Sequence, residues 1–294
     1  MKRLITSGCS FTSYTPSITW PIFLSEKFDE TYNYGQQGAG NKFIFNSIIE
    51  ADTRLRLSSD DLVIVQWSTF FRHDILKREF DGFNIKRYWK TNGDWYYWPQ
   101  HRKGDETLLY QCITESFSEE EYIHMTHTYM LALSRYLKAK NIPYLFTSLQ
   151  DCRKIGCMHD NKYGELEELY DDRFIVPHGL VKYLERDRFL LNNTLGWSWG
   201  GHPSNSLHYK IAKTFADKIG FSLSSHDDLI ELDKITKSEL EITAFNRPFD
   251  NHPLNKECLT DISESQWSGI HRQGFKYHPN TVSIYKQILK EVCL

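Results

Sequence analysis

The stretch RLITSGCSFT, residues 3–12, carries a short apolar segment directly into a turn. Leu4 and Ile5 favour a buried strand, and Gly8 marks the turn that ends it. A cysteine and two hydroxyl residues are packed into the same few positions. A loop at this place either connects two elements or presents a side chain, and the rest of the sequence decides between these readings.

Strand and helix patterns alternate from this turn to residue 149. Residues 16–28 have apolar side chains at helical spacing with Pro16 near the start, and helical spacing resumes from Asn41. The near-continuous apolar run DLVIVQW, residues 61–67, is typical of a buried parallel strand. Further strands are predicted at 3–6, 31–35 and 142–149, and a further helix at 118–141. This order predicts an α/β fold of three layers, with helices on both faces of a central parallel sheet.

Two less regular segments interrupt the main α/β domain, which we assign to residues 1–220. The insertions span about 78–117 and 150–200, and residues 221–294 are predicted to form a C-terminal extension that packs on the main domain. It ends in a last helix near residues 282–292.

The first insertion holds much of the aromatic content of the chain. Residues 80–101 gather tyrosines and tryptophans around the Asn92-Gly93 turn signal, which predicts a hairpin whose aromatic side chains pair across its strands. The same rings are good stacking surfaces for a sugar or a base, so Trp95 and Trp98 are candidate substrate-binding residues.

Composition restricts the class of protein. A formal net charge of -3 disfavours a nucleic-acid partner, and no apolar stretch is long enough for a membrane span or a secretory leader, so we expect a soluble cytoplasmic protein. The six cysteines are scattered without paired spacing, which fits reduced thiols. Cys152, Cys157 and His159 lack a second cluster that would complete a zinc site, so no metal or other cofactor is expected.

Four motifs in order resemble the SGNH or GDSL-type hydrolases: GCSFT at 8–12, NYGQQGAGN at 33–41, VIVQWS at 63–68 and HPSNSLHYKIA at 202–212. That resemblance implies a flavodoxin-like fold, a catalytic serine and cleavage of acyl esters, often on carbohydrates or lipids. It covers roughly residues 1–220.

The resemblance also implies roles for individual residues. Ser10 matches the nucleophile, and its backbone N–H matches one donor to the oxyanion. Gly38 matches the glycine that supplies a second donor, and His202 matches the base that accepts the serine proton. These residue types suit acyl transfer, because a serine hydroxyl needs a neighbouring base and the tetrahedral oxyanion needs donors already in place.

The sequence departs from the family pattern at three positions. Cys9 replaces the usual acid of the first motif. The asparagine expected after the third strand is absent, and Ser68 and Thr69 stand there instead. The third oxyanion donor is therefore one of these two residues or the Asn41 amide. Trp199 stands where an acid is expected three residues before His202. His202 is then oriented either by a backbone carbonyl or by an acid from elsewhere in the chain, for which Asp151, after the fourth predicted strand, is our candidate.

Other assignments remain open at this level. His278 in YHPN and His208 are rivals of His202 for the base. Arg72 is either a substrate clamp or a solvated helix charge. His124 and His127 are spaced as metal ligands are, but nothing nearby completes a set.

Together these features predict a serine esterase that hydrolyses or transfers an acyl group, with an O-acylated carbohydrate as the substrate class that the aromatic segment suggests. The alternative is a non-catalytic carbohydrate-binding or ligand-binding module that keeps the fold without the orienting acid. The expected partner is a small-molecule or carbohydrate ester, and the composition is compatible with a homo-oligomer.

Overall fold

The structure is a computed structural model of the chain. It describes residues 1–13, 18–36, 38–70, 72, 74–81, 84–91, 119–150, 168–176, 179–180, 197–198, 202–233, 259–261, 275–277 and 279–293. Side chains are described in most of these ranges but not in 75–91, at 119–120 and 197–198, at 202, in 259–261, at 275 or in 288–293.

Four parallel strands form the centre of the sheet. They are β1 (Arg3–Ser7), β2 (Glu30–Asn33), β3 (Asp61–Trp67) and β6 (Tyr144–Ser148), in the spatial order β6-β3-β1-β2. All seven residues of β3 are buried, as its apolar run predicts. The order reverses between β1 and β3, where chain connections leave in opposite directions and where such sheets place their functional groups.

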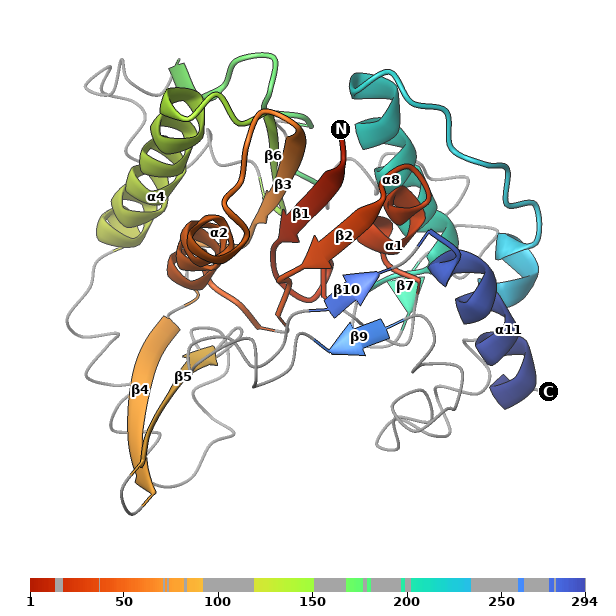
Figure 1. Cartoon of the computed structure of the whole chain (residues 1–294), viewed down its shortest axis with the longest axis horizontal. Helices are drawn as coiled ribbons and strands as arrows, with labels where there is room; N and C mark the ends of the chain where they lie inside the picture. Colours follow the sequence, from red (N-terminus) through yellow and green to blue (C-terminus); the bar gives the residue numbers. More distant parts are fainter. Residues whose placement is uncertain are drawn as a thin grey trace.

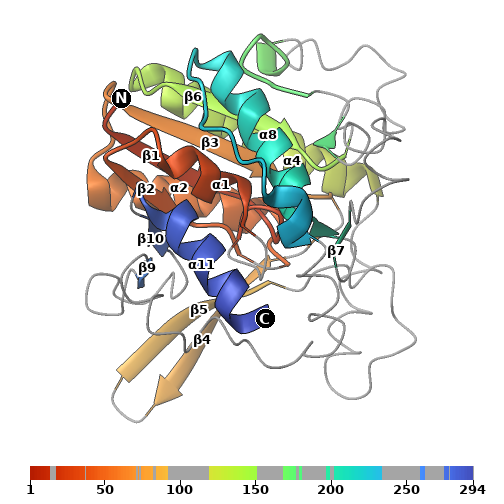
Figure 2. The ribbon, with the colours of Figure 1, turned by 90° about the vertical axis from the view of Figure 1, so that its right-hand side faces the viewer.

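Helices cover both faces of this sheet (Figures 1 and 2). One face carries α2 (Asn41–Leu55) and α4 (Glu119–Ala139), and the other carries α1 (Trp20–Ser25), α8 (Asn205–Lys218) and α11 (Thr281–Cys293). Alternate strand residues supply the two cores: Val63 and Val65 pack with α2 and α4, whereas Leu62 and Ile64 pack with α1 and α8. The three-layer α/β fold expected from the sequence is therefore confirmed.

The C-terminal segment adds two strands to the same sheet. β10 (Phe275–Tyr277) pairs antiparallel with β2, and β9 (Leu259–Asp261) pairs antiparallel with β10. Within the described ranges the sheet thus has six strands and is mixed at this edge. The sequence pattern did not predict these strands, because each is only three residues long. The domain boundary at residue 220 stays a prediction.

The first helix is shorter than the sequence pattern indicates. It begins at Trp20 rather than near Pro16, with Thr19 at the N-cap position and Pro21 in the first turn. Proline is tolerated in the first turn of a helix but removes a hydrogen bond further inside, so Pro21 sets where this helix can begin.

A hairpin is present in the aromatic segment, formed by β4 (Asp74–Asp81) and β5 (Asn84–Thr91). Its last pair is Asp81 with Asn84, so this hairpin reverses direction well before the Asn92-Gly93 signal. The predicted turn at Asn92-Gly93 lies outside the described residues. Among the helices that the structure describes, none has the length and apolar character required to cross a membrane.

Candidate functional site

The turn that follows β1, residues 8–13, is tightly closed. The Cys9 carbonyl accepts hydrogen bonds from the backbone N–H groups of Thr12 and Ser13, both at 2.9 Å. A Cβ at Gly8 would lie 2.2 Å from Thr12 Oγ1, so this position requires glycine. Ser10 is 7% exposed. Within the described part of the chain, no hydrogen bond to its hydroxyl is present.

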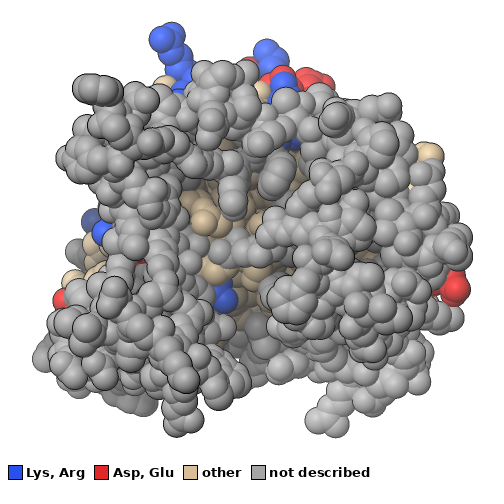
Figure 3. Space-filling model, turned by 90° about the horizontal axis from the view of Figure 1, so that it is seen from below, with Lys and Arg blue, Asp and Glu red and all other residues tan. Residues whose placement is uncertain are grey.

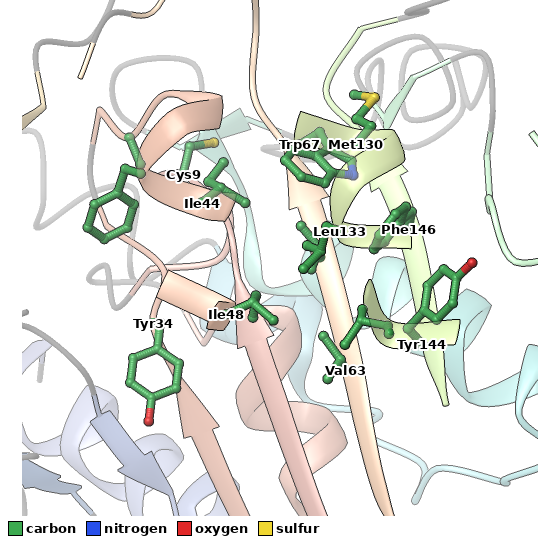
Figure 4. Close-up of a cluster of buried hydrophobic side chains, with 14 of the residues drawn as sticks. Cys9, Tyr34, Ile44, Ile48, Val63, Trp67, Met130, Leu133, Tyr144 and Phe146 are labelled. Carbon is green, nitrogen blue, oxygen red and sulfur yellow. The ribbon is translucent and has the colours of Figure 1, made fainter. Parts of the chain in front are cut away.

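The Gln66 side chain, on β3, holds the 8–13 turn through two hydrogen bonds to side chains of the turn. Gln66 Oε1 accepts a hydrogen bond from Thr12 Oγ1 at 3.0 Å, and Gln66 Nε2 donates to Cys9 Sγ at 3.3 Å. Cys9 is fully buried in the same core cluster as Ile44 (Figure 4). An ionised carboxylate here would lose its hydration among apolar side chains, which costs several kcal/mol. The thiol of Cys9 avoids that cost.

The loop between β2 and α2 lies against this turn. The Gln36 N–H donates to the Gly8 carbonyl at 3.0 Å, and a Cβ at Gly35 would lie 2.6 Å from the Ser13 nitrogen. Gly38 has φ 73, a conformation that glycine adopts without strain. The predicted nucleophile and the predicted second oxyanion donor therefore belong to adjoining backbone segments.

The Asn41 amide is engaged with the protein rather than open to a substrate. Its Oδ1 accepts from the Ser68 N–H at 2.8 Å. Its Nδ2 donates to Thr126 Oγ1 at 3.0 Å and makes longer contacts of 3.4 and 3.3 Å with the carbonyls of Ser68 and Thr69. These contacts favour a role in fixing the end of β3 over donation to an oxyanion. The Ser68 hydroxyl, by contrast, is buried and has no hydrogen-bond partner among the described residues.

Asp74 anchors the start of α2 and is a residue that sequence reasoning missed. Its Oδ1 accepts from the Gly40 N–H and its Oδ2 from the Phe43 N–H, both at 2.8 Å. Burial raises the pKa of Asp74 to about 6, although the two N–H donors favour the charged form. Arg72 lies in a loop, not on a helix, and its Nη1 donates to the Ala39 carbonyl at 3.3 Å. Asp74 lies seven residues after β3, whereas the helix it caps, α2, comes before β3 in the chain. No local sequence pattern connects the two.

The backbone around His202 is fixed by the start of α8. His202 and Pro203 form β8, which pairs antiparallel with β7 (Trp197–Ser198). Asp233 accepts hydrogen bonds from the Asn205 N–H at 2.8 Å and the Ser206 N–H at 3.2 Å, and burial raises its pKa despite these donors. The His202 side chain lies outside the described residues.

One contact ties this region to the chain that follows the 8–13 turn. Asn205 Oδ1 accepts a hydrogen bond from the Ile18 N–H at 2.7 Å. Figures 1 and 2 both place β7 at the end of α8 that lies toward the ends of the parallel strands. Figure 3 views the molecule from this edge, and the described residues in the middle of that face are mostly neither acidic nor basic.

The structure brings Ser10, Gly38, Asn41, Ser68 and Arg72 to the edge where β1, β2 and β3 end. Other residues singled out from the sequence lie outside the described residues: Trp95, Trp98, Asp151, Cys152, Cys157, His159, Trp199 and His278. His208 is fully buried on α8. In the ranges that the structure covers, no three His, Cys, Asp or Glu side chains group as metal ligands would.

The chain is similar to several solved structures, but the comparisons by sequence found no match. No family model matches the chain, and no curated protein matches it. Among solved structures, it is similar to a catalytic mutant of Axe2, an acetylxylan esterase from Geobacillus stearothermophilus, with 13% identity and a TM-score of 0.42 over 76% of this chain and 97% of that one.

A second similar structure is a member of the lipolytic protein G-D-S-L family from Veillonella parvula. Its identity is 11% and its TM-score 0.39, over 74% of this chain and 97% of that one. Both likenesses concern the course of the backbone alone. Likeness this distant transfers neither a mechanism nor a substrate, so the function must be argued from the residues of this chain.

Proposed function

We propose that the protein is a serine esterase in which Ser10 is the nucleophile and His202 the base. The observation that carries this proposal is the state of Ser10: a serine in the hydrogen-bonded 8–13 turn after β1, with no hydrogen bond to its hydroxyl in the described residues. A hydroxyl that makes no such bond, at the edge where the parallel strands end, can meet a substrate carbonyl, which suits a group used in reaction.

The reaction begins when Ser10 Oγ attacks the acyl carbonyl carbon and His202 accepts the hydroxyl proton. The tetrahedral oxyanion is met by the backbone N–H groups of Ser10 and Gly38, with the Ser68 hydroxyl as a third donor. The C–O bond to the alcohol then breaks, and His202 returns the proton to the departing alcohol oxygen.

The acyl group now rests on Ser10 as an ester. Water attacks this ester while His202 accepts a proton, and collapse of the second tetrahedral intermediate releases the carboxylic acid and restores the Ser10 hydroxyl. If a second alcohol replaces water, the same steps transfer the acyl group. Asp151 is proposed to orient His202, and Arg72 and the aromatic pair Trp95 and Trp98 to bind an O-acylated carbohydrate.

A second candidate function follows from Trp199, which stands three residues before His202 where an orienting acid is expected. Loss of that acid can reduce the rate about 10⁴-fold, which would leave a binding module rather than an efficient enzyme. The two candidates differ in whether ester turnover depends on Ser10.

Turnover of p-nitrophenyl acetate separates them. We expect a burst of p-nitrophenol followed by slower steady release, with both phases lost in Ser10→Ala and His202→Ala. Ser283→Ala, which changes an exposed serine on α11, is the matched control and should behave as the parent. Equal release by the parent and Ser10→Ala would overturn the esterase proposal. For the substrate class, binding of an O-acetylated oligosaccharide that is unchanged in Trp95→Ala and Trp98→Ala would remove the carbohydrate assignment.

A further inference from the structure

A tyrosine from the C-terminal segment contacts the end of β2, the strand next to β1. Tyr277 is the last residue of β10, it pairs with Thr31 of β2, and it is fully buried. Its hydroxyl accepts a hydrogen bond of 2.9 Å from Asn33 Nδ2, the side-chain amide at the end of β2. These two residues are 244 positions apart in the chain.

The Asn33 amide is saturated by protein groups. Its Nδ2 donates to the Thr12 carbonyl at 2.7 Å as well as to Tyr277, and its Oδ1 accepts from Thr6 Oγ1 at 3.0 Å and from the Gly35 N–H at 2.9 Å. Two donors and two acceptors are all that an amide offers, so all four bonds together fix its orientation. One of the four reaches the 8–13 turn and another reaches the loop that precedes Gly38.

We propose that Tyr277 is a positioning residue for Ser10, acting through Asn33 on the 8–13 turn. The inference deepens the proposed function and rests on it, because Ser10 is the group that the turn presents. By this reasoning the segment after α8 is part of the working site rather than an appendage. Without the tyrosine hydroxyl, one Asn33 N–H would be left buried without its acceptor. The amide would then be held by fewer hydrogen bonds, and its bond to the Thr12 carbonyl would be less firmly oriented.

Accurate placement of a nucleophile matters more for rate than for binding. A displacement of about 1 Å can cost about a hundred-fold in rate, because the reacting atoms must meet at close range and in line. Tyr277→Phe removes one oxygen atom and keeps the aromatic ring in the core, so it tests the hydroxyl with little effect on packing.

The matched control is Tyr144→Phe. The Tyr144 hydroxyl shares a buried hydrogen bond of 2.8 Å with the Ser134 hydroxyl. Tyr144 is the first residue of β6, so it lies at the opposite end of the parallel strands from Ser10. Both variants lose a buried tyrosine hydroxyl that is hydrogen-bonded to a described residue, so an effect of general destabilisation would appear in the two alike.

The experiment has one readout that does not depend on catalysis. Cys9 is fully buried and sits next to Ser10, so its alkylation by iodoacetamide, followed by peptide mapping, reports opening of the 8–13 turn. Loss of one neutral hydrogen bond makes opening about five-fold more frequent, so Tyr277→Phe should be alkylated at Cys9 about five-fold faster than the parent and Tyr144→Phe. Equal rates in the two variants would overturn the inference.

The second readout uses a fluorophosphonate that labels Ser10. In Tyr277→Phe the rate of labelling at saturating probe should fall by about ten-fold to a hundred-fold, with the probe concentration for half-maximal rate little changed. Tyr144→Phe should label as the parent does. If the parent itself is not labelled, the proposed function fails, and the Cys9 rates alone still decide whether Tyr277 holds the turn.

Discussion

The charge state of Asp74 offers a quantitative test of how the start of α2 is held. Its carboxyl has a pKa of about 6 in the folded protein against 3.8 for an ordinary aspartate, because burial disfavours the charged form. Between these two values the folded state binds more protons than the unfolded state. The free energy of unfolding contributed by this group therefore rises as the pH falls through 6 and declines again as the pH rises.

The size of the effect follows from the shift. About two pKa units correspond to about 3 kcal/mol, of which about 2 kcal/mol is reached by about pH 4. Asp74→Asn has no titrating group, so the free energy of unfolding of the parent minus that of the variant should increase by about 2 kcal/mol from about pH 7.5 to about pH 4. Urea denaturation of both proteins across this range measures the difference directly.

Asp52→Asn is the control for this experiment. Burial raises the pKa of Asp52, but hydrogen bonds from Lys140 and Tyr136 outweigh it and the net pKa is lowered. Its contribution to stability is therefore present above the ordinary pKa and lost only in stronger acid, so the same difference should stay flat above about pH 4.5. If the Asp74 difference is flat or falls in acid, the two N–H donors dominate and our account of its burial is wrong.

Three further predictions concern the scaffold around the site. Gly40→Ala should lower the free energy of unfolding by about 1–3 kcal/mol in a urea titration, because its Cβ would lie 2.7 Å from the Arg72 carbonyl oxygen; an unchanged midpoint would show that the loop can move aside. Asp233→Asn should speed amide hydrogen exchange in the first turn of α8 and leave α2 unchanged, since only the former loses a capping acceptor; faster exchange in both helices would point to general loosening. Gln66→Leu should cost about 1–3 kcal/mol in thermal unfolding because it leaves the Thr12 hydroxyl buried without its partner, and a more stable variant would refute that reading.

The sequence predicts those parts of the fold whose signal is local. The run at 61–67 coincides with β3, and the helical spacing from Asn41 coincides with α2, because an uninterrupted buried strand and an amphipathic helix each leave a pattern in adjacent residues. The roles of Ser10 and Gly38 come instead from a resemblance carried by short motifs next to strand ends, and they stay predictions.

Features made by distant residues were not predictable from such patterns. Tyr277 meets Asn33 across 244 positions, and Asp74 caps a helix that begins 33 residues before it, at Asn41. Neither pairing leaves a local pattern, because only the folded sheet brings the partners together. The same holds for β9 and β10, whose three-residue length carries no period to detect.

The most direct test of the central claim is to treat the parent and His202→Ala with a fluorophosphonate, and to locate the label by intact mass and peptide mapping. We predict one label per chain, on Ser10, formed in the parent between about pH 6 and about pH 9 and strongly reduced in His202→Ala. A parent that takes up no label on Ser10 across this range would contradict the esterase account and favour the binding module.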